Sequence, residues 1–279
     1  MSSFPMTSVG SLGISRVVIG SNQFLGYSHF SAAKDRWLRE YFTPERMADV
    51  MEVYARRGVN AIMAGPSDAI RRAIDIAEDR TGRHIHYVTT PGRDHPRGLE
   101  GAIEQCRELG SAICMPHASC TDNSLLVERG AILGIEPLLA RIRDLGMIPG
   151  LSTHRVETIT IADAAGYDVE TYIQPLNPIG FLCSVETDWV VRVINRTQKP
   201  VMCIKPFAAG RVLPSTGLLF VLNSCKPTDM VVMGTMSAYE AEEDLDIAEA
   251  IMQGSKPEVE QAMTRSKAHL QHASPEARA

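Results

Sequence analysis

Eight short apolar runs recur along the chain, and each is followed by a stretch whose apolar residues have helical spacing. The runs cover residues 16–20, 60–64, 84–88, 112–115, 147–151, 169–173, 201–204 and 230–233. Eight buried strands that alternate with helices are typical of a closed parallel barrel, because each helix returns the chain to the start of the next parallel strand. We therefore predict an α/β fold of the (β/α)8 TIM-barrel class, with its active site at the carboxyl ends of the strands.

The length of the chain fits one such barrel. A TIM barrel typically needs roughly 250 residues, and this chain has 279, of which 44% are hydrophobic. We expect a single domain over residues 1–279, with the barrel at about 12–254, a C-terminal helix at about 256–271 and a disordered tail at 273–279. No low-complexity segment or linker divides the sequence.

Charge and composition favour a small-molecule substrate. The net charge is -5 and the basic residues are scattered, so no basic patch for nucleic acid or an anionic membrane is evident. The N-terminus lacks the basic start and apolar core of a signal peptide, and no apolar run reaches the roughly 18 residues of a membrane span. The six cysteines form no Cys-x-x-Cys pair, which argues against disulfides and a cysteine metal site. We expect a cytoplasmic protein, and its oligomeric state is left open.

Local signals place several boundaries between strands and helices. Thr43-Pro44-Glu45 supplies an N-cap, a first-turn proline and an early acid, and Gly58 ends the helix that follows. Glycines at 130 and 134 interrupt the helical stretch 124–145, so we expect a short turn and then a main helix from Ile135. Prolines and a glycine in residues 175–180 predict an extended loop after the sixth strand.

Three histidines lie close to predicted strand ends. His117 follows the fourth strand and is expected to project into the barrel mouth, where it can act as an acid, a base, an electrophile or a metal ligand. His154 follows the fifth strand, and His29 lies in the loop after the first. Together the three can be ligands of a divalent metal, although no carboxylate is evident at a neighbouring strand end. The alternative for His117 is a structural hydrogen bond to a backbone carbonyl.

Lys205 stands at the end of the seventh strand between apolar neighbours. A lysine in such surroundings can lose its proton and act as a base or Schiff-base nucleophile, or keep its charge and hold an anion. The alternative is a lysine that reaches solvent or pairs with a carboxylate. We take His117, His154 and Lys205 as the candidate catalytic residues.

Polar residues at other strand ends are candidates for substrate binding. Four amides are of the kind that bind a substrate hydroxyl or carboxamide, or that instead hold a loop through local hydrogen bonds. They are Asn22, Gln23, Gln174 and Asn177. Gly210-Arg211 and Gly234-Thr235 follow the last two strands, where barrels commonly bind phosphate. Ser152 and Thr153 end the fifth strand and have a helix N-cap as their structural alternative.

Several segments together resemble the aldo-keto reductase superfamily, especially its shorter bacterial branch. Residues 12–20 are similar to its opening strand, and residues 150–154 are similar to its Gly-x-Ser-Asn turn. Residues 172–177 are similar to its Gln-x-x-Tyr-Asn stretch, and residues 204–210 to its Lys-Pro-Leu-x-x-Gly segment. Residues 234–245 are similar to its closing Glu-Asn-Leu signature. The likeness spans nearly the whole chain, and each match is degenerate. It implies the fold of that family.

The resemblance also implies a site and a cofactor. In that family a nicotinamide lies across the barrel mouth, and Asp, Tyr, Lys and His reduce a carbonyl. His117 matches the histidine, whereas residues 63–68 and 88–91 lack the other three. Ser152 and Gln174 match residues that hold the nicotinamide carboxamide. Gly234 lies in the closing signature, and Glu243 and Asp244 fall where the family binds adenine. Ile204 replaces the aromatic residue that stacks on the nicotinamide.

Three functions are compatible with these residues. Because the tyrosine that delivers a proton is missing, we expect acid–base chemistry of the lyase or isomerase type on a small polar, carbonyl- or sugar-like substrate. His117 would be the acid or base, Lys205 the base or oxyanion partner, and His29 and His154 secondary groups or metal ligands. Asn22, Gln23, Gln174, Asn177 and Arg211 would orient the substrate. One alternative is an NAD(P)H-dependent oxidoreductase in which Tyr27 or another loop residue replaces the missing acid. The other is a barrel that binds a ligand without catalysis.

Overall fold

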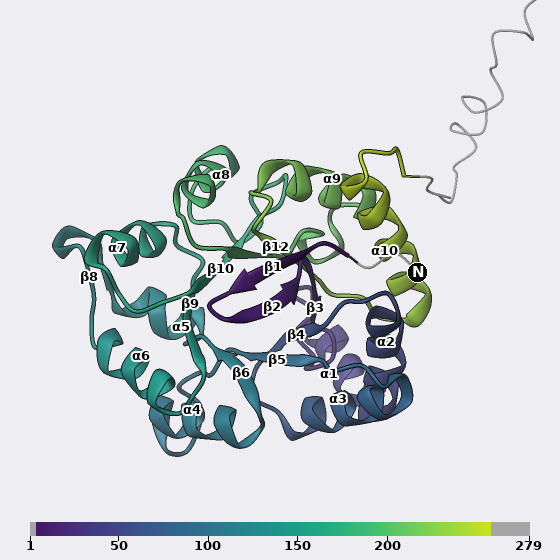
Figure 1. Cartoon of the computed structure of the whole chain (residues 1–279), viewed down its shortest axis with the longest axis horizontal. Coiled ribbons are helices and arrows are strands. Elements are labelled where there is room, and N and C mark those ends of the chain that lie inside the picture. The colour runs from purple at the N-terminus through teal and green to yellow at the C-terminus, as the bar shows by residue number, and fades with distance from the viewer. Residues whose placement is uncertain (1–3, 258–279) are drawn as a thin grey trace, which may run out of the picture.

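Eight parallel strands close into a barrel in the computed structural model, which describes residues 4–257. Along the barrel each strand pairs with the next in sequence, and the last pairs with the first (Figure 1). This confirms the predicted TIM-barrel fold. The strands are β3 (Val17–Gly20), β4 (Ala61–Ala64), β5 (His86–Thr89), β6 (Ser111–Cys114), β9 (Ile148–Ser152), β10 (Thr171–Pro175), β11 (Val201–Ile204) and β12 (Met230–Met233).

Eight helices surround the barrel and cover its outer face (Figure 1). Thr43 caps α2 by accepting a hydrogen bond from the Arg46 N–H, and Gly130 and Gly134 adopt positive φ angles before α6, as the sequence predicts. The helices are α2 (Pro44–Arg56), α3 (Asp68–Thr81), α4 (Gly98–Glu108), α6 (Ile135–Asp144), α7 (Glu157–Ala165), α8 (Thr187–Arg196), α9 (Pro214–Ser224) and α10 (Ala238–Met252). The C-terminal helix and tail predicted beyond residue 257 lie outside the described residues.

Other elements depart from a plain strand–helix repeat and were not predicted. A long helix, α1 (Ala32–Tyr41), lies between β3 and α2, and the short helix α5 (Ala118–Thr121) follows β6. A small hairpin of β7 (Leu125–Leu126) and β8 (Ala131–Ile132) precedes α6.

A second hairpin closes one end of the barrel. It consists of β1 (Met6–Val9) and β2 (Leu12–Ser15), and Figure 1 shows it across the end that faces the viewer. Val9 and Ile14 are fully buried and belong to the same apolar cluster as Val18 and Ile173 inside the barrel. The opposite end, at which the strands finish, is therefore the mouth.

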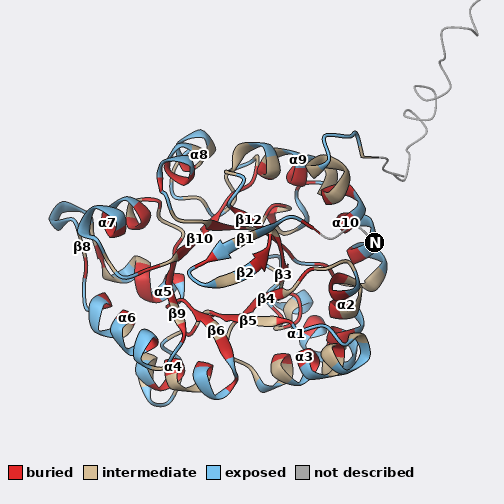
Figure 2. Ribbon diagram, viewed as in Figure 1, coloured by how far each residue is buried: buried red, intermediate tan, exposed pale blue. Residues whose placement is uncertain are grey.

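Side chains alternate between the barrel interior and the layer under the helices. Ile173 and Met202 belong to the interior cluster, whereas their neighbours Tyr172 and Cys203 pack under the helices. The strands are largely buried on both sides (Figure 2), as expected for a parallel sheet covered by helices. The alternation fixes which side chain at each strand end points inward.

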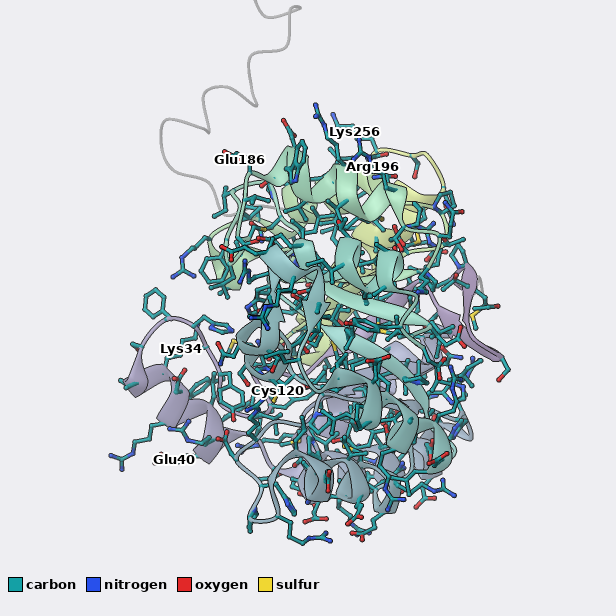
Figure 3. The ribbon with its side chains drawn as sticks, turned by 90° about the vertical axis from the view of Figure 1, so that its left-hand side faces the viewer. Lys34, Glu40, Cys120, Glu186, Arg196 and Lys256 are labelled. Carbon is teal, nitrogen blue, oxygen red and sulfur yellow. The ribbon has the colours of Figure 1, made fainter. Side chains whose placement is uncertain are left out.

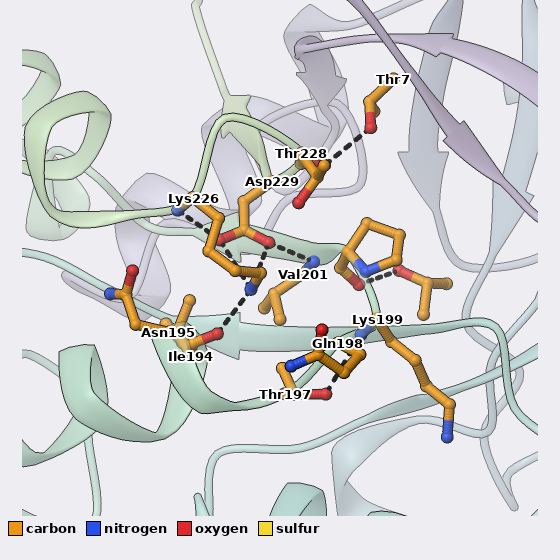
Figure 4. A network of polar contacts seen from close by, with 12 residues as sticks. Thr7, Ile194, Asn195, Thr197, Gln198, Lys199, Val201, Lys226, Thr228 and Asp229 are labelled. Atoms are coloured by element: carbon orange, nitrogen blue, oxygen red, sulfur yellow. Dashed lines mark hydrogen bonds and ion pairs between the residues drawn. The ribbon is translucent and has the colours of Figure 1, made fainter.

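A buried ion pair joins several elements at the end of the barrel away from the mouth. Asp229 is fully buried, accepts hydrogen bonds from the Val201 and Lys226 N–H groups at 2.8 and 2.7 Å, and lies 2.8 Å from the Lys226 ammonium (Figure 4). The same ammonium donates to the Ile194 carbonyl at the end of α8. This network ties the starts of β11 and β12 to α8 and fixes the strands whose other ends form the mouth.

Candidate active site

Four neighbouring strands supply most of the polar groups at the mouth. In the barrel, β6, β9, β10 and β11 lie side by side in that order. His117 comes three residues after β6, His154 two residues after β9, and Lys205 directly after β11. In Figure 3, α1 with Lys34 and Glu40 lies at the mouth end, and the purple β1–β2 hairpin lies at the other. The loop with His29 leads into α1.

The charge of Lys205 acts on all three histidines. Burial, followed by the charge of Lys205, lowers the pKa of His29 and of His117. The pKa of His154 falls to about 4 through burial, Lys205, His117 and His29, in that order. All three imidazoles are therefore neutral at pH 7, so the positive charge among the four resides on the lysine.

The tautomer of His117 follows from its neighbours. The Ser119 N–H donates to His117 Nδ1 at 3.2 Å, so Nδ1 is an acceptor. A neutral ring must then carry its proton on Nε2. The foreseen hydrogen bond to a backbone carbonyl is not observed within residues 4–257; Nδ1 instead caps α5 by accepting from a backbone N–H, and Nε2–H remains a donor for a ligand.

Asp122 positions the end of β9 and was missed by the sequence analysis. Its carboxylate accepts hydrogen bonds from the Thr153 hydroxyl and, at 3.0 Å, from the His154 N–H. Burial raises the pKa of this carboxyl in spite of those hydrogen bonds. The N-cap alternative for Ser152 and Thr153 is wrong, because α7 begins at Glu157 and its N-cap is Val156. Asp122 lies 31 residues from Thr153 in sequence, so no local pattern pairs the two.

Lys205 is a largely buried cation without a counterion. Within residues 4–257, its ammonium makes no hydrogen bond and no ion pair, so the proposed pairing with a carboxylate is not observed. Burial lowers its pKa to about 8. Its φ angle of 63° lies in the left-handed region, which costs a non-glycine residue on the order of 1–3 kcal/mol. Strain of this size occurs mainly at functional sites.

Two of the four amides hold the backbone instead of facing a ligand. Asn177 donates to the Phe181 carbonyl at 3.0 Å and accepts from the Phe181 N–H at 2.8 Å. Gln23 donates to the carbonyls of Gly20 and Thr235 at 3.0 and 2.9 Å, which joins the ends of β3 and β12. These residues are therefore corrected from substrate ligands to loop anchors. Asn22 is exposed and lies 3.2 Å from Nε2 of His29.

Gln174 points away from the mouth, and its predicted contact with substrate and nicotinamide is wrong. The interior position next to it belongs to Ile173, so alternation turns Gln174 toward the helices. It is fully buried, and its Oε1 has no hydrogen-bond partner. The sequence comparison did not show which face of the strand Gln174 occupies, and neighbouring residues of a strand point to opposite faces.

Ser152, Gly234, Glu243 and Asp244 are the residues that the sequence analysis assigned to a dinucleotide. Ser152 takes an inward position at the end of β9, and the described residues offer its hydroxyl no partner. Gly234 is exposed at the end of β12. On α10, Glu243 is exposed and Asp244 is buried. Burial, with the charges of Glu240 and Glu243, raises the pKa of Asp244 to about 7.

Arg211 links three loops of the mouth. Its guanidinium donates to the carbonyls of Ala208 and His29 at 3.1 and 3.2 Å and lies 4.5 Å from the centre of the Phe181 ring. The loops after β3, β10 and β11 therefore meet at this side chain.

A metal site is not formed by the expected histidines. Among residues 4–257, no group of three or more His, Cys, Asp or Glu side chains is arranged to hold a metal ion, so His29, His117 and His154 are not a ligand set. No helix in the same residues is long and apolar enough to cross a membrane.

Comparison with solved structures identifies the architecture. A protein of Pseudomonas aeruginosa assigned to the aldo-keto reductases superposes with a TM-score of 0.64 at 16% identity, over 89% of this chain and 94% of that one. A glycerol dehydrogenase from Gluconobacter oxydans gives 0.56 at 12%, over 93% and 98%. An aldo-keto reductase from Klebsiella pneumoniae in complex with NADPH gives 0.56 at 12%, over 97% and 94%. No family model matches the chain, and no curated protein does. The chain thus has the (β/α)8 barrel fold seen in these aldo-keto reductase structures.

The comparison corrects the expected reaction. The sequence analysis favoured a lyase or isomerase because three of the four reductase catalytic residues have no match in this chain. The similar structures, however, are reductases and a dehydrogenase. The oxidoreductase alternative agrees better with these findings.

Proposed function

We propose that the protein is an enzyme, a nicotinamide-dependent oxidoreductase that interconverts a small carbonyl compound and its alcohol. The observation that carries this proposal is the presence of two hydrogen-bond donors at the mouth. They are His117 Nε2–H and the Lys205 ammonium, which has no partner in the described residues. They supply an electrophile and an acid, the two functions that carbonyl reduction requires beyond a hydride. The barrel that it shares with reductases supports the same assignment.

The residues at the mouth fit a nicotinamide dinucleotide in part. The free hydroxyl of Ser152 would hold the carboxamide, and Gly234 with the start of α10 would receive the rest of the molecule. Ile173 and Ile204 belong to or pack against the interior apolar cluster and would make apolar contacts only. When bound, the cofactor supplies or accepts a hydride.

The chain itself would bind and protonate the substrate oxygen. Neutral His117 donates its Nε2–H to that oxygen, as an uncharged histidine electrophile does. Lys205, with a pKa near 8, holds a proton at neutral pH and releases it more readily than an ordinary lysine. It thereby replaces the missing tyrosine. Tyr27 is the weaker candidate, because its side chain is 58% exposed.

Calorimetric titration with NADH and NADPH tests the proposal. We expect saturable binding of one dinucleotide per chain, weakened on the order of tenfold in Ser152→Ala through loss of one buried hydrogen bond. Ser184→Ala, at an exposed position of the loop after β10, is the matched control and leaves binding unchanged. Absence of binding by either dinucleotide would refute the proposed function.

A further inference from the structure

The mouth carries positive charge that no acidic side chain balances. Lys205 has no ion-pair partner in residues 4–257, and Arg211 bonds only to backbone carbonyls. Three carboxylates influence the histidines from nearby. Asp35 is bonded to the N–H and hydroxyl of Ser28, Asp122 is bonded to Thr153 and His154, and Asp94 is exposed to solvent. None of them is bonded to the lysine.

Such an arrangement is unfavourable in the free protein. Buried charges are normally paired, because removal from water is not compensated otherwise. The histidines do not provide compensation, since the Lys205 charge and their burial keep them neutral. The anion that balances Lys205 is therefore expected to come from a ligand.

Building on the proposed function, we propose that the substrate is a 2-oxo acid, or the corresponding 2-hydroxy acid, whose carboxylate binds Lys205. The carboxylate and carbonyl oxygens of such a molecule are adjacent, so one ammonium with three N–H donors reaches both. His117 Nε2–H donates to the carbonyl oxygen from β6. The same lysine would thus neutralise the carboxylate and donate a proton to the carbonyl oxygen, while the hydride supplied by the dinucleotide would add to the carbonyl carbon.

A carboxylate fits this mouth better than a phosphate group. A phosphate dianion usually takes several donors from arginines or backbone N–H groups. Here the guanidinium of Arg211 is already committed to two carbonyls, which leaves one full charge for the ligand. Inward residues at the neighbouring strand ends, such as Ile173 and Ile204, are apolar. We therefore expect a short apolar side chain on the oxo acid.

Binding of oxamate, an unreactive 2-oxo acid analogue, and of its neutral methyl ester tests this proposal. Calorimetry on the protein saturated with NADH is expected to show oxamate binding on the order of tenfold or more tighter than the ester. Lys205→Met removes that preference, whereas Lys205→Arg keeps it because the charge remains. Lys199→Met is the matched control, since Lys199 pairs with Asp163 before the start of β11, at the other end of the strand.

Two results overturn the proposal. One is equal binding of oxamate and its ester, or a preference that survives Lys205→Met. The other is a Lys205→Met variant that binds ADP-ribose more weakly than the wild type but binds oxamate equally well. This result would assign the lysine to the pyrophosphate of the cofactor. The NADH titration tests the proposed function separately. If NADH does not bind, the affinities of oxamate and its methyl ester for the protein without dinucleotide still test whether Lys205 binds a carboxylate.

Discussion

Replacement of Lys205 by methionine should stabilise the protein at neutral pH. Burial lowers the pKa of this lysine from 10.5 to about 8, which corresponds to about 3 kcal/mol at roughly 1.4 kcal/mol per tenfold change in proton affinity. The ammonium retains some contact with solvent, so we expect a gain of about 1–3 kcal/mol in the free energy of unfolding at pH 7. Methionine has a similar length and the same left-handed backbone strain, so other terms change little.

The pH dependence identifies the cause of this gain. Because the folded pKa lies below the unfolded value, the cost is complete below pH 8 and disappears as the pH rises from 8 to 10.5. The wild type should therefore gain stability relative to Lys205→Met across this interval. Urea unfolding of both proteins at pH 7, 9 and 10.5 measures the difference. A variant that is less stable than the wild type at pH 7, or a difference independent of pH, would show that Lys205 has a partner.

Three further predictions concern the scaffold and the cofactor. Lys226→Met should lower the free energy of unfolding by about 3–5 kcal/mol, because it leaves the Asp229 carboxylate buried without its cation. Urea unfolding measures this loss, and Lys199→Met, which breaks the more exposed Lys199–Asp163 ion pair, is the control. Gly150→Ala should cost about 1–3 kcal/mol in the same assay, since its Cβ would lie 2.7 Å from the Thr171 carbonyl oxygen; Gly92→Ala, with open space around it, should cost little. NADH should bind on the order of tenfold more tightly than NADPH in calorimetry, because the 2′-phosphate would lie beside the acidic start of α10; tighter NADPH binding would contradict this.

The barrel was predictable because its strands are buried on both sides. Continuous apolar runs bounded by turns mark such strands, and each of the eight runs overlaps an observed strand. The hairpin β1–β2 was not recognised, since most of its residues are exposed or partly exposed and several are polar or glycine. The hairpin covers one end of the barrel, and this contact depends on the tertiary structure and not on the local sequence.

The mouth was predictable at the level of strand ends but not of individual contacts. His117, His154 and Lys205 follow the ends of β6, β9 and β11, because strand direction alone places them there, and their catalytic roles stay predictions. The prediction for Gln174 failed because its neighbour Ile173 takes the interior position, and successive residues of a strand point to opposite faces. Asp122 was missed because its partners lie on a distant strand.

The retained and lost groups together constrain the chemistry of the mouth. A tyrosine acid works without charge, so it accepts neutral carbonyl compounds equally well. Lys205 stands at a different strand end, and its buried charge has a cost in the free protein that an anionic ligand would remove. The residue proposed to deliver the proton would therefore also select for a charged substrate, and the energy that Lys205 costs the free protein would become available for binding. Stability lost at pH 7 and affinity for a carboxylate are then two measurements of one interaction. They should disappear together in Lys205→Met, and loss of only one would separate the lysine's structural cost from its proposed role.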